Sequence, residues 1–151
     1  MTLRIATRDD TAEIWRVRYA VTENTLTPGR ISDAEIHTYL EDYGRGWVVE
    51  LAPAPNLKIA GFSIGDARTG HIWAMFVDPA LHGHGYGRQL HDVMVDWLFA
   101  QGHTRLDLGT QPGSRAEAFY RRAGWTPIDD GLDTHGDKGF ELLAQDWRRD
   151  A

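Results

Sequence analysis

Residues 82–88 read HGHGYGR, a stretch in which glycine occupies every second position. The apolar run HIWAMFV at 71–77 precedes it, and the residues after it have the apolar spacing of a helix. A strand, a glycine-rich turn and a helix in succession leave unpaired backbone N–H groups at the helix N-terminus, which is a general anion site. Glycines also let a phosphate approach the backbone, because they carry no Cβ atom. The stretch therefore predicts a phosphate-binding turn.

Two other interpretations of residues 82–88 stay open at this point. A glycine-rich turn that caps a helix needs no ligand. A metal site would combine His82 and His84 with His91, but His91 lies two turns along the helix and no carboxylate or cysteine completes a ligand set, so we expect no metal. Neither common nucleotide motif is present, because Arg88 replaces the last glycine of the dinucleotide fingerprint and no P-loop sequence occurs. Basic residues that would bring positive charge to a phosphate are Arg88, His82, His84, Arg115, Arg121 and Arg122.

The elements that position this stretch follow from capping residues, apolar periodicity and turn signals. In the first half we expect a strand at 3–6, helices opened by Thr7 with Asp10 and by Ser32 with Glu35, and strands at 47–51 and 58–65. In the second half we expect a strand at 71–77, a helix closed by Gly102, a strand at 104–110, a helix opened by Ser114 with Glu117, and strands at 125–128 and 140–144 around a polar loop.

This order of elements predicts an α/β (α+β mixed) fold with a central mixed, mostly antiparallel sheet and helices on both faces. The strand at 71–77 is apolar on both faces, which places it in the middle of the sheet. We found no repeat or linker, so the 151 residues are expected to form a single domain over 1–151.

Composition excludes several classes of protein. The formal net charge of −6, without a run of lysine and arginine, argues against nucleic-acid binding. The absence of cysteine excludes disulfides and thiolate metal sites and fits a reducing cytosol. No apolar run has the length of a membrane span, and the N-terminus lacks the apolar stretch of a signal peptide. We therefore expect a soluble, cytoplasmic protein.

Two motifs resemble those of a known family, the GCN5-related N-acetyltransferases. VDPALHGHGYGRQL at 77–90 is similar to the family's acetyl-CoA motif R/Q-x-x-G-x-G/A, with Gly85 and Gly87 at the glycine positions. AEAFYRRAGW at 116–125 is similar to the segment A-x-x-F-Y-x-x-x-G-F/W. The sequence departs from the first motif at its first position, where His82 stands in place of arginine or glutamine. Together the motifs resemble the family strongly, and the order of elements extends the likeness to the whole chain.

The resemblance implies an N-acetyltransferase that uses acetyl-CoA as cosubstrate and acetylates a primary amine of a small molecule or peptide by direct attack in a ternary complex. Tyr120 would be the general acid that protonates the departing thiolate. Thr110 and Ser114 would contact the pantetheine or the acceptor. Residues implied to bind acetyl-CoA are Met75, Phe76 and Val77 at the end of a strand that splays from the next one, and His82, Gly83, His84, Gly85, Tyr86, Gly87 and Arg88 around the pyrophosphate.

The acceptor side is expected near the first helix and the turn after it. Residues assigned to substrate binding are Arg18, Glu23, Asn24, Trp47, Trp73 and Thr110, with Trp15 and Tyr19 beside them. Trp47 and Trp73 lie on strands expected to be neighbours. An aromatic pocket with one carboxylate would suit a small cationic or aromatic amine, although each tryptophan also fits a place in the core. Candidate general bases are Glu23, Glu50, Asp66 and His71, and an amine that arrives neutral needs none.

Three alternatives remain beside this interpretation. The enzyme would transfer a longer acyl group if space beside the thioester allowed it. The chain would instead be a non-catalytic CoA-binding regulatory or interaction module if its catalytic residues had lapsed, and a histidine-dependent metal protein is the third. Strand edges exposed at the C-terminal end are also compatible with a homodimer.

Overall fold

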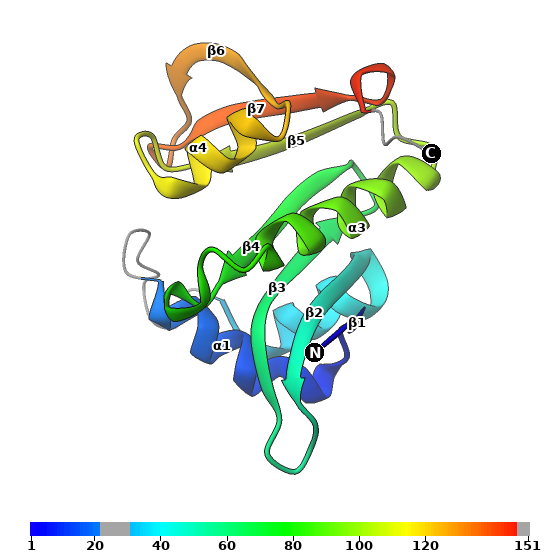
Figure 1. The fold of residues 1–151 in the computed structure, drawn as a ribbon. Helices are drawn as coiled ribbons and strands as arrows, with labels where there is room; N and C mark the ends of the chain where they lie inside the picture. The colour runs from blue at the N-terminus through cyan, green and yellow to red at the C-terminus, as the bar shows by residue number, and fades with distance from the viewer. Residues whose placement is uncertain (22–30, 148–151) are drawn as a thin grey trace.

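A computed structural model describes residues 1–21 and 31–147 (Figure 1). Seven strands form one sheet in the order β1-β2-β3-β4-β5-β7-β6. β4 pairs antiparallel with β3 and parallel with β5, and the other pairs are antiparallel. The strands are β1 (Thr2–Ile5), β2 (Gly44–Ala52), β3 (Lys58–Asp66), β4 (His71–Val77), β5 (Arg105–Thr110), β6 (Thr126–Leu132) and β7 (Lys138–Leu143). The predicted mixed sheet, with 71–77 as its middle strand, is confirmed.

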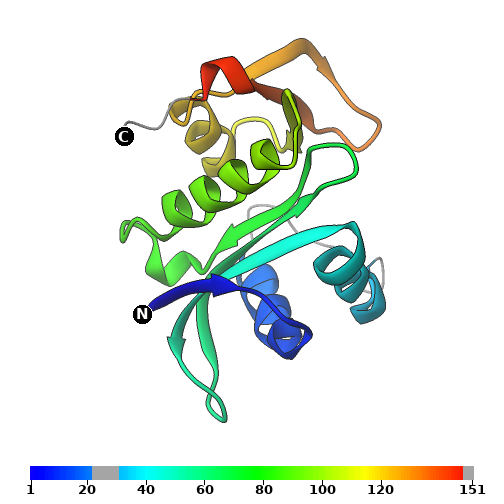
Figure 2. The same cartoon turned by 90° about the vertical axis from the view of Figure 1, so that its right-hand side faces the viewer.

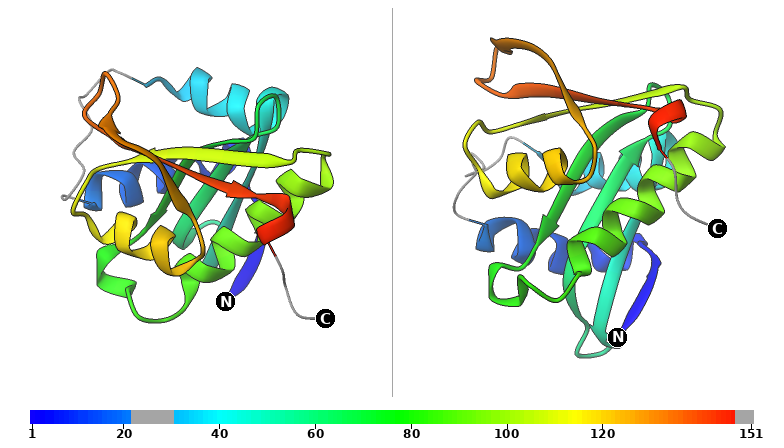
Figure 3. Two further views of the ribbon diagram at one scale, coloured as in Figure 1. Left: turned by 90° about the horizontal axis from the view of Figure 1, so that it is seen from above. Right: turned by 45° about the horizontal axis from the view of Figure 1, so that its top comes forward.

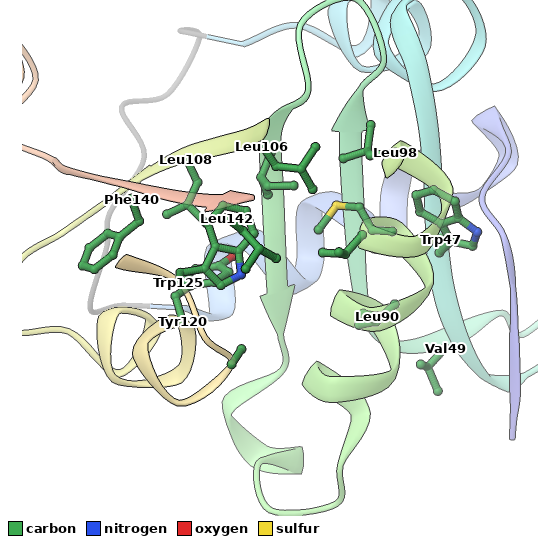
Figure 4. Close-up of a cluster of buried hydrophobic side chains, with 14 of the residues drawn as sticks. Trp47, Val49, Leu90, Leu98, Leu106, Leu108, Tyr120, Trp125, Phe140 and Leu142 are labelled. Carbon is green, nitrogen blue, oxygen red and sulfur yellow. The ribbon is translucent and has the colours of Figure 1, made fainter. Parts of the chain in front are cut away.

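Helices cover both faces of the sheet (Figure 2). They are α1 (Thr11–Ala20), α2 (Asp33–Thr38), α3 (Tyr86–Ala100) and α4 (Arg115–Arg122), with short helical turns η1 (Arg8–Asp10), η2 (Tyr39–Tyr43), η3 (Pro79–Leu81) and η4 (Ala144–Asp146). Side chains alternate between the faces along each strand. On β2, Val48 packs against α1 and α2, whereas Trp47 and Val49 pack against α3. The buried residues on the α3 side, which also include Tyr120 and Trp125, form the larger of the two core clusters (Figure 4).

Local sequence accounts for α3, the helix that follows the glycine stretch. Leu90, Met94 and Leu98 are fully buried on the face predicted from the apolar spacing. The helix ends at Ala100, and Gln101 is its C-cap. Gly102 follows with a φ of 101°, the left-handed conformation that favours glycine after a helix. The predicted caps are also present at other helices, since Ser32 and Ser114 accept hydrogen bonds from the backbone N–H groups of Glu35 and Glu117.

The sheet divides between β4 and β5. In the described residues, the two strands share a single register pair, His71 with Asp107, at the beginning of β4. Beyond that pair they diverge, so that the β5-β7-β6 portion lies apart from the carboxyl-terminal half of β4 (Figures 1 and 3). The splay expected at Met75, Phe76 and Val77 is therefore present.

Two expectations about the strands are wrong. The closing strands were expected at 125–128 and 140–144, but β6 and β7 continue toward each other and leave a turn of only Asp133–Asp137, in which Asp133 N–H donates to the Asp137 carbonyl. All of β6 is exposed at the edge of the sheet, so its sequence carries no apolar alternation that would show its full length. Trp47 and Trp73 do not lie on neighbouring strands, because β3 separates β2 from β4.

No helix within residues 1–21 and 31–147 combines the length and the apolar character needed to cross a membrane.

Candidate active site

A cavity of about 840 Å³ lies where β4 and β5 diverge. Its walls come from segments far apart in the sequence. Most of the lining comes from α1, β4, the turn at 79–85, the first turn of α3, the end of β5, and α4, and single residues of α2, β3 and the turn between β6 and β7 also contribute. The gap in the sheet thus leads directly to the glycine stretch and to the second sequence motif, at 116–125.

The open edge of β4 turns backbone groups toward the cavity. Asp78 N–H donates to the Ala60 carbonyl on β3 at 2.8 Å, and Phe76 is paired with Phe62 in the same register. Because peptide groups alternate in direction along an antiparallel pair, the N–H and C=O of Val77 and Met75 point away from β3, toward the cavity. The amide of Val77 therefore faces the cavity, whereas the amide of Phe76 faces β3.

The glycine stretch has the geometry of an anion-binding turn. Gly83 and Gly85 have φ angles of 88° and 80°, in the left-handed region where other residues are strained. A Cβ atom built on either glycine would have no protein atom within 4 Å, so open space lies in front of both. Gly85 is the N-cap of α3 and has no side chain to cap its first amides. Gly87, in the first turn, packs near Phe119 and Val77. Nothing in this turn obstructs a phosphate, and the N-terminus of a fifteen-residue helix favours one.

Basic side chains surround the turn. Arg88, His82, Arg115 and Arg122 line the cavity. Arg88 is half-exposed, and its Nε lies 3.0 Å from Asp92 Oδ1. His84 is not among the cavity-lining residues. Its ring stacks on Tyr86 at 5.6 Å, and Nδ1–H donates to the Leu81 carbonyl at 3.0 Å, so this side chain braces the turn.

Tyr120, the expected acid, lies at the boundary between core and cavity. It is 5% exposed, lines the cavity, and packs edge-on against Trp125 with 5.7 Å between ring centroids. Its hydroxyl makes no hydrogen bond to the described residues, yet it is not a buried unsatisfied group, so it opens to the cavity. Burial raises the pKa of Tyr120 well above its ordinary value, which keeps the phenol protonated at neutral pH. The hydroxyl is therefore protonated and borders the cavity.

Thr110 and Ser114 also line the cavity, at the end of β5 and the start of α4. Ser114 Oγ donates to the Gln111 carbonyl at 2.6 Å and accepts from Glu117 N–H at 3.1 Å. These bonds commit the Ser114 hydroxyl to the cap of α4 and leave a structural role as its clearest one. Thr110 is buried beside the open edge.

The end of the cavity beside α1 is aromatic and contains a cation. Arg18 lies over the ring of Phe76, with its Cζ 4.4 Å from the ring centroid, and burial lowers the pKa of this guanidinium. Trp73 stacks on Tyr39 with centroids 3.9 Å apart and planes at 9°. Trp15, Arg18 and Trp73 all line the cavity. Glu23 and Asn24 lie outside the described residues.

Trp47 is not part of the site. It is 4% exposed in the core under α3, edge-on to Trp97, whereas Trp73 packs with the cluster of α1 and α2. The two tryptophans therefore lie on opposite faces of the sheet. The prediction that both tryptophans belong to one pocket is wrong, because the registers of β2 with β3 and of β3 with β4 put their side chains on opposite faces of the sheet.

Three candidate bases lie outside the cavity lining. Glu50 pairs with Arg4, Asp66 with Arg68, and His71 with Asp107, at 2.8 to 3.0 Å. Each carboxylate or imidazole is thus held in a contact of its own. The fourth candidate, Glu23, falls outside the described residues.

Some cavity residues carried no signal in the sequence. Gly109 and Asp137 line the cavity side by side, since a Cβ on Gly109 would lie 3.4 Å from that of Asp137. Their proximity arises from the pairing of β5 with β7, which no local pattern announces. For metals, residues 1–21 and 31–147 contain no group of three histidine or acidic side chains that would hold an ion.

A match to a protein family and a match to one similar protein both concern acetyltransferases. Residues 8–125 match the acetyltransferase (GNAT) family. A mycothiol acetyltransferase of Beutenbergia cavernae is 42% identical over 64 residues, which are 42% of this chain and only 22% of that protein's length.

The fold recurs in solved structures. An acetyltransferase of the GNAT family from Staphylococcus aureus Mu50 superposes with a TM-score of 0.77 at 19% identity, covering 94% of this chain and 98% of the other. Rv2747 of Mycobacterium tuberculosis, solved in complex with CoA, gives 0.70 at 18% identity, covering 95% and 99%. At these identities the likeness establishes the fold, and the match over 8–125 establishes the family. The chain therefore belongs to the acetyltransferase (GNAT) family of acyltransferase enzymes.

Proposed function

We propose that this protein transfers an acetyl group from acetyl-CoA to a primary amine of a small molecule or peptide, by direct attack within a ternary complex. The observation that carries the proposal is the continuity of the site. An open strand edge on β4, a left-handed glycine turn and a protonated tyrosine border one cavity. The family membership supports acetyl transfer in general.

The residues present fit acetyl-CoA. The first-turn amides of α3, with Gly83 and Gly85 leaving open space before them, would bind the pyrophosphate, and Arg88 would add a charge-assisted contact. The outward peptide groups of Met75 and Val77 would pair with the amides of the pantetheine arm, as an added strand does.

Two needs of the reaction then have a group in place, a donor for the carbonyl oxygen and a proton for the departing sulfur. The Val77 N–H would donate to the carbonyl oxygen as it gains negative charge, which lowers the barrier because the donor is already oriented. The Tyr120 hydroxyl would give its proton to the departing sulfur. Of the four base candidates, the three described ones lie outside the cavity lining, so the amine would enter the site neutral or lose its first proton through water. As the amide forms, the nitrogen would release one further proton through water, and the same route would return a proton to Tyr120.

Release of free CoA from acetyl-CoA, measured across a panel of amines and amino-terminal peptides, tests this proposal. We expect release that requires both an amine and Tyr120. Turnover only with longer acyl donors would assign a different acyl group. Binding of acetyl-CoA without turnover on any amine would favour a CoA-binding module. The single domain, the homodimer and the cytoplasmic location predicted from the sequence stay predictions.

A further inference from the structure

A buried histidine on α3 connects two parts of the site. His91 is fully buried, and its Nε2 accepts a hydrogen bond from Trp125 Nε1–H at 2.9 Å. An indole N–H can only donate, so Nε2 carries no proton and the ring's remaining proton is on Nδ1. Nδ1–H then donates to Asp92 Oδ1 at 2.8 Å. The structure thus permits a single neutral tautomer of His91.

The chain of bonds continues to the phosphate-binding turn. Arg88 Nε–H donates to Asp92 Oδ2 at 3.2 Å, and the same nitrogen lies 3.0 Å from Oδ1 in an ion pair. Arg88 lies in the first turn of α3 and lines the cavity, whereas His91 is not among the lining residues. The hydrogen bond from His91 restrains the Asp92 carboxylate, and the carboxylate in turn restrains the guanidinium of Arg88.

In the opposite direction, the series of hydrogen bonds leads from His91 through Trp125 to α4, the helix that carries the proposed acid. Trp125 follows α4, and its backbone N–H donates to the Tyr120 carbonyl at 3.0 Å. Figure 4 shows the two rings side by side, across from α3. Since β4 and β5 share one register pair in the described residues, the sheet alone does little to fix α4 relative to the turn. The bond between His91 and Trp125 is a direct polar link between α3 and the segment that follows α4.

We propose that His91 is a positioning residue, which orients Arg88 through Asp92 and holds Trp125, and with it α4, against α3. The proposal rests on the proposed function, because its effect is on the binding of CoA. Among described residues, the titratable or charged groups around the ring are Asp92, Asp96 and Arg88 on α3 itself and Tyr120 on α4. Phe119, Trp125 and Trp147 complete the enclosure.

The tautomer is testable without any ligand. In protein labelled with ¹⁵N-histidine at pH 7, we expect one ring, absent in His91→Gln, to show a protonated Nδ1 and an unprotonated Nε2. A proton on Nε2 of His91 would overturn the relay, whatever the protein binds.

Binding of CoA, measured by calorimetry, tests the positioning role in four proteins: wild type, His91→Leu, Arg88→Ala and the double variant. If His91 acts through Arg88, His91→Leu weakens CoA binding about tenfold in wild type, the worth of one oriented charge-assisted bond, but less than about twofold in Arg88→Ala. Equal factors in both backgrounds would refute the coupling. Where His91→Leu does not fold, His91→Gln takes its place in the same cycle.

Trp147→Phe is the matched control for a merely structural role. Trp147 Nε1–H donates at 2.8 Å to Asp96, which lies on α3 as His91 does, and neither Trp147 nor Asp96 lines the cavity. We expect this variant to lower Tm without changing the Kd for CoA. If His91→Leu also changes only Tm, His91 is structural and the proposal is wrong. A wild type that does not bind CoA would instead refute the proposed function, and the tautomer measurement still decides the relay.

Discussion

His71 on β4 and Asp107 on β5 face each other at the one register pair that joins the two strands in the described residues, and His71 Nδ1 lies 2.9 Å from Asp107 Oδ1. Past this point the strands separate, and the rest of β4 keeps an open edge toward the cavity. The site is therefore built on an interruption of the sheet. The groups that bind and react come from the edge itself and from the helix N-terminus that follows β4.

Gly85→Ala tests the turn. The alanine must adopt a φ near 80°, which costs about 1–2 kcal/mol of folding free energy, and its methyl group would occupy the space in front of the first-turn amides. We expect CoA to bind at least about tenfold more weakly. Gly102→Ala is the matched control, with a φ of 101° at the other end of α3. It should lose similar stability and keep its affinity, and equal affinities in the two variants would remove residues 82–88 from the binding site.

Tyr120→Phe tests the proton donor. We expect kcat to fall by about a hundredfold or more, the usual worth of a general acid, while the Kd for acetyl-CoA changes little. The hydroxyl opens to the cavity, so its loss should cost little stability. Tyr43→Phe, outside the cavity lining, serves as the control. Unchanged turnover in Tyr120→Phe would eliminate this residue as the acid.

The buried imidazole predicts a dependence of stability on pH. Burial lowers the pKa of His91 below the ordinary 6.5, with Asp92 opposing the effect. The unfolded chain therefore binds a proton below about pH 6.5 that the folded protein does not, and the free energy of unfolding falls as the pH drops from there toward the lowered pKa.

Urea unfolding of wild type and His91→Gln between pH 7.5 and 5 measures this contribution. The wild-type curve should fall more steeply, by up to about 1.4 kcal/mol per pH unit for one proton. Parallel curves would mean that His91 ionises as readily in the folded protein as in the unfolded chain.

Substitutions of Trp47 and Trp73 should differ in their effects on stability and on KM, because the two side chains lie on opposite faces of the sheet. Trp47→Leu removes a ring from the core and should lower the free energy of unfolding by about 3 kcal/mol without altering the KM for any amine that supports turnover. Trp73→Leu removes the ring stacked on Tyr39 in the cavity and should raise that KM while leaving the Kd for CoA unchanged. Similar effects of the two variants on KM would contradict the assignment of faces.

Local sequence was sufficient for the glycine turn, α3 and their helix caps. Leu90, Met94 and Leu98 recur at helical spacing, and Gly85 and Gly102 occupy positions whose φ angles only glycine adopts readily. These features depend on near neighbours in the chain, so a motif of a few residues can predict them.

Contacts between distant segments were not predictable in the same way. The stack of Trp73 on Tyr39, the approach of Asp137 to Gly109 and the bond from Trp125 to His91 all require the strand order and the packing of helices. From the sequence, His91 was considered only for a metal site, because a histidine on an apolar helix face gives no sign of its hydrogen-bond partner. The continuation of β6 beyond residue 128 was not predicted for a related reason, since an exposed edge strand has no buried face to set its pattern.

Thermal unfolding with and without CoA tests the central claim, that the turn at 82–88 and the open edge of β4 form a CoA site. With CoA at about one hundred times its Kd, linkage stabilises the folded state by about 2.7 kcal/mol, so Tm should rise by roughly 5–10 °C in wild type. Gly85→Ala at the same CoA concentration should show about half of that rise or less, and Gly102→Ala a rise like that of wild type. No rise in wild type at saturating CoA would contradict the account.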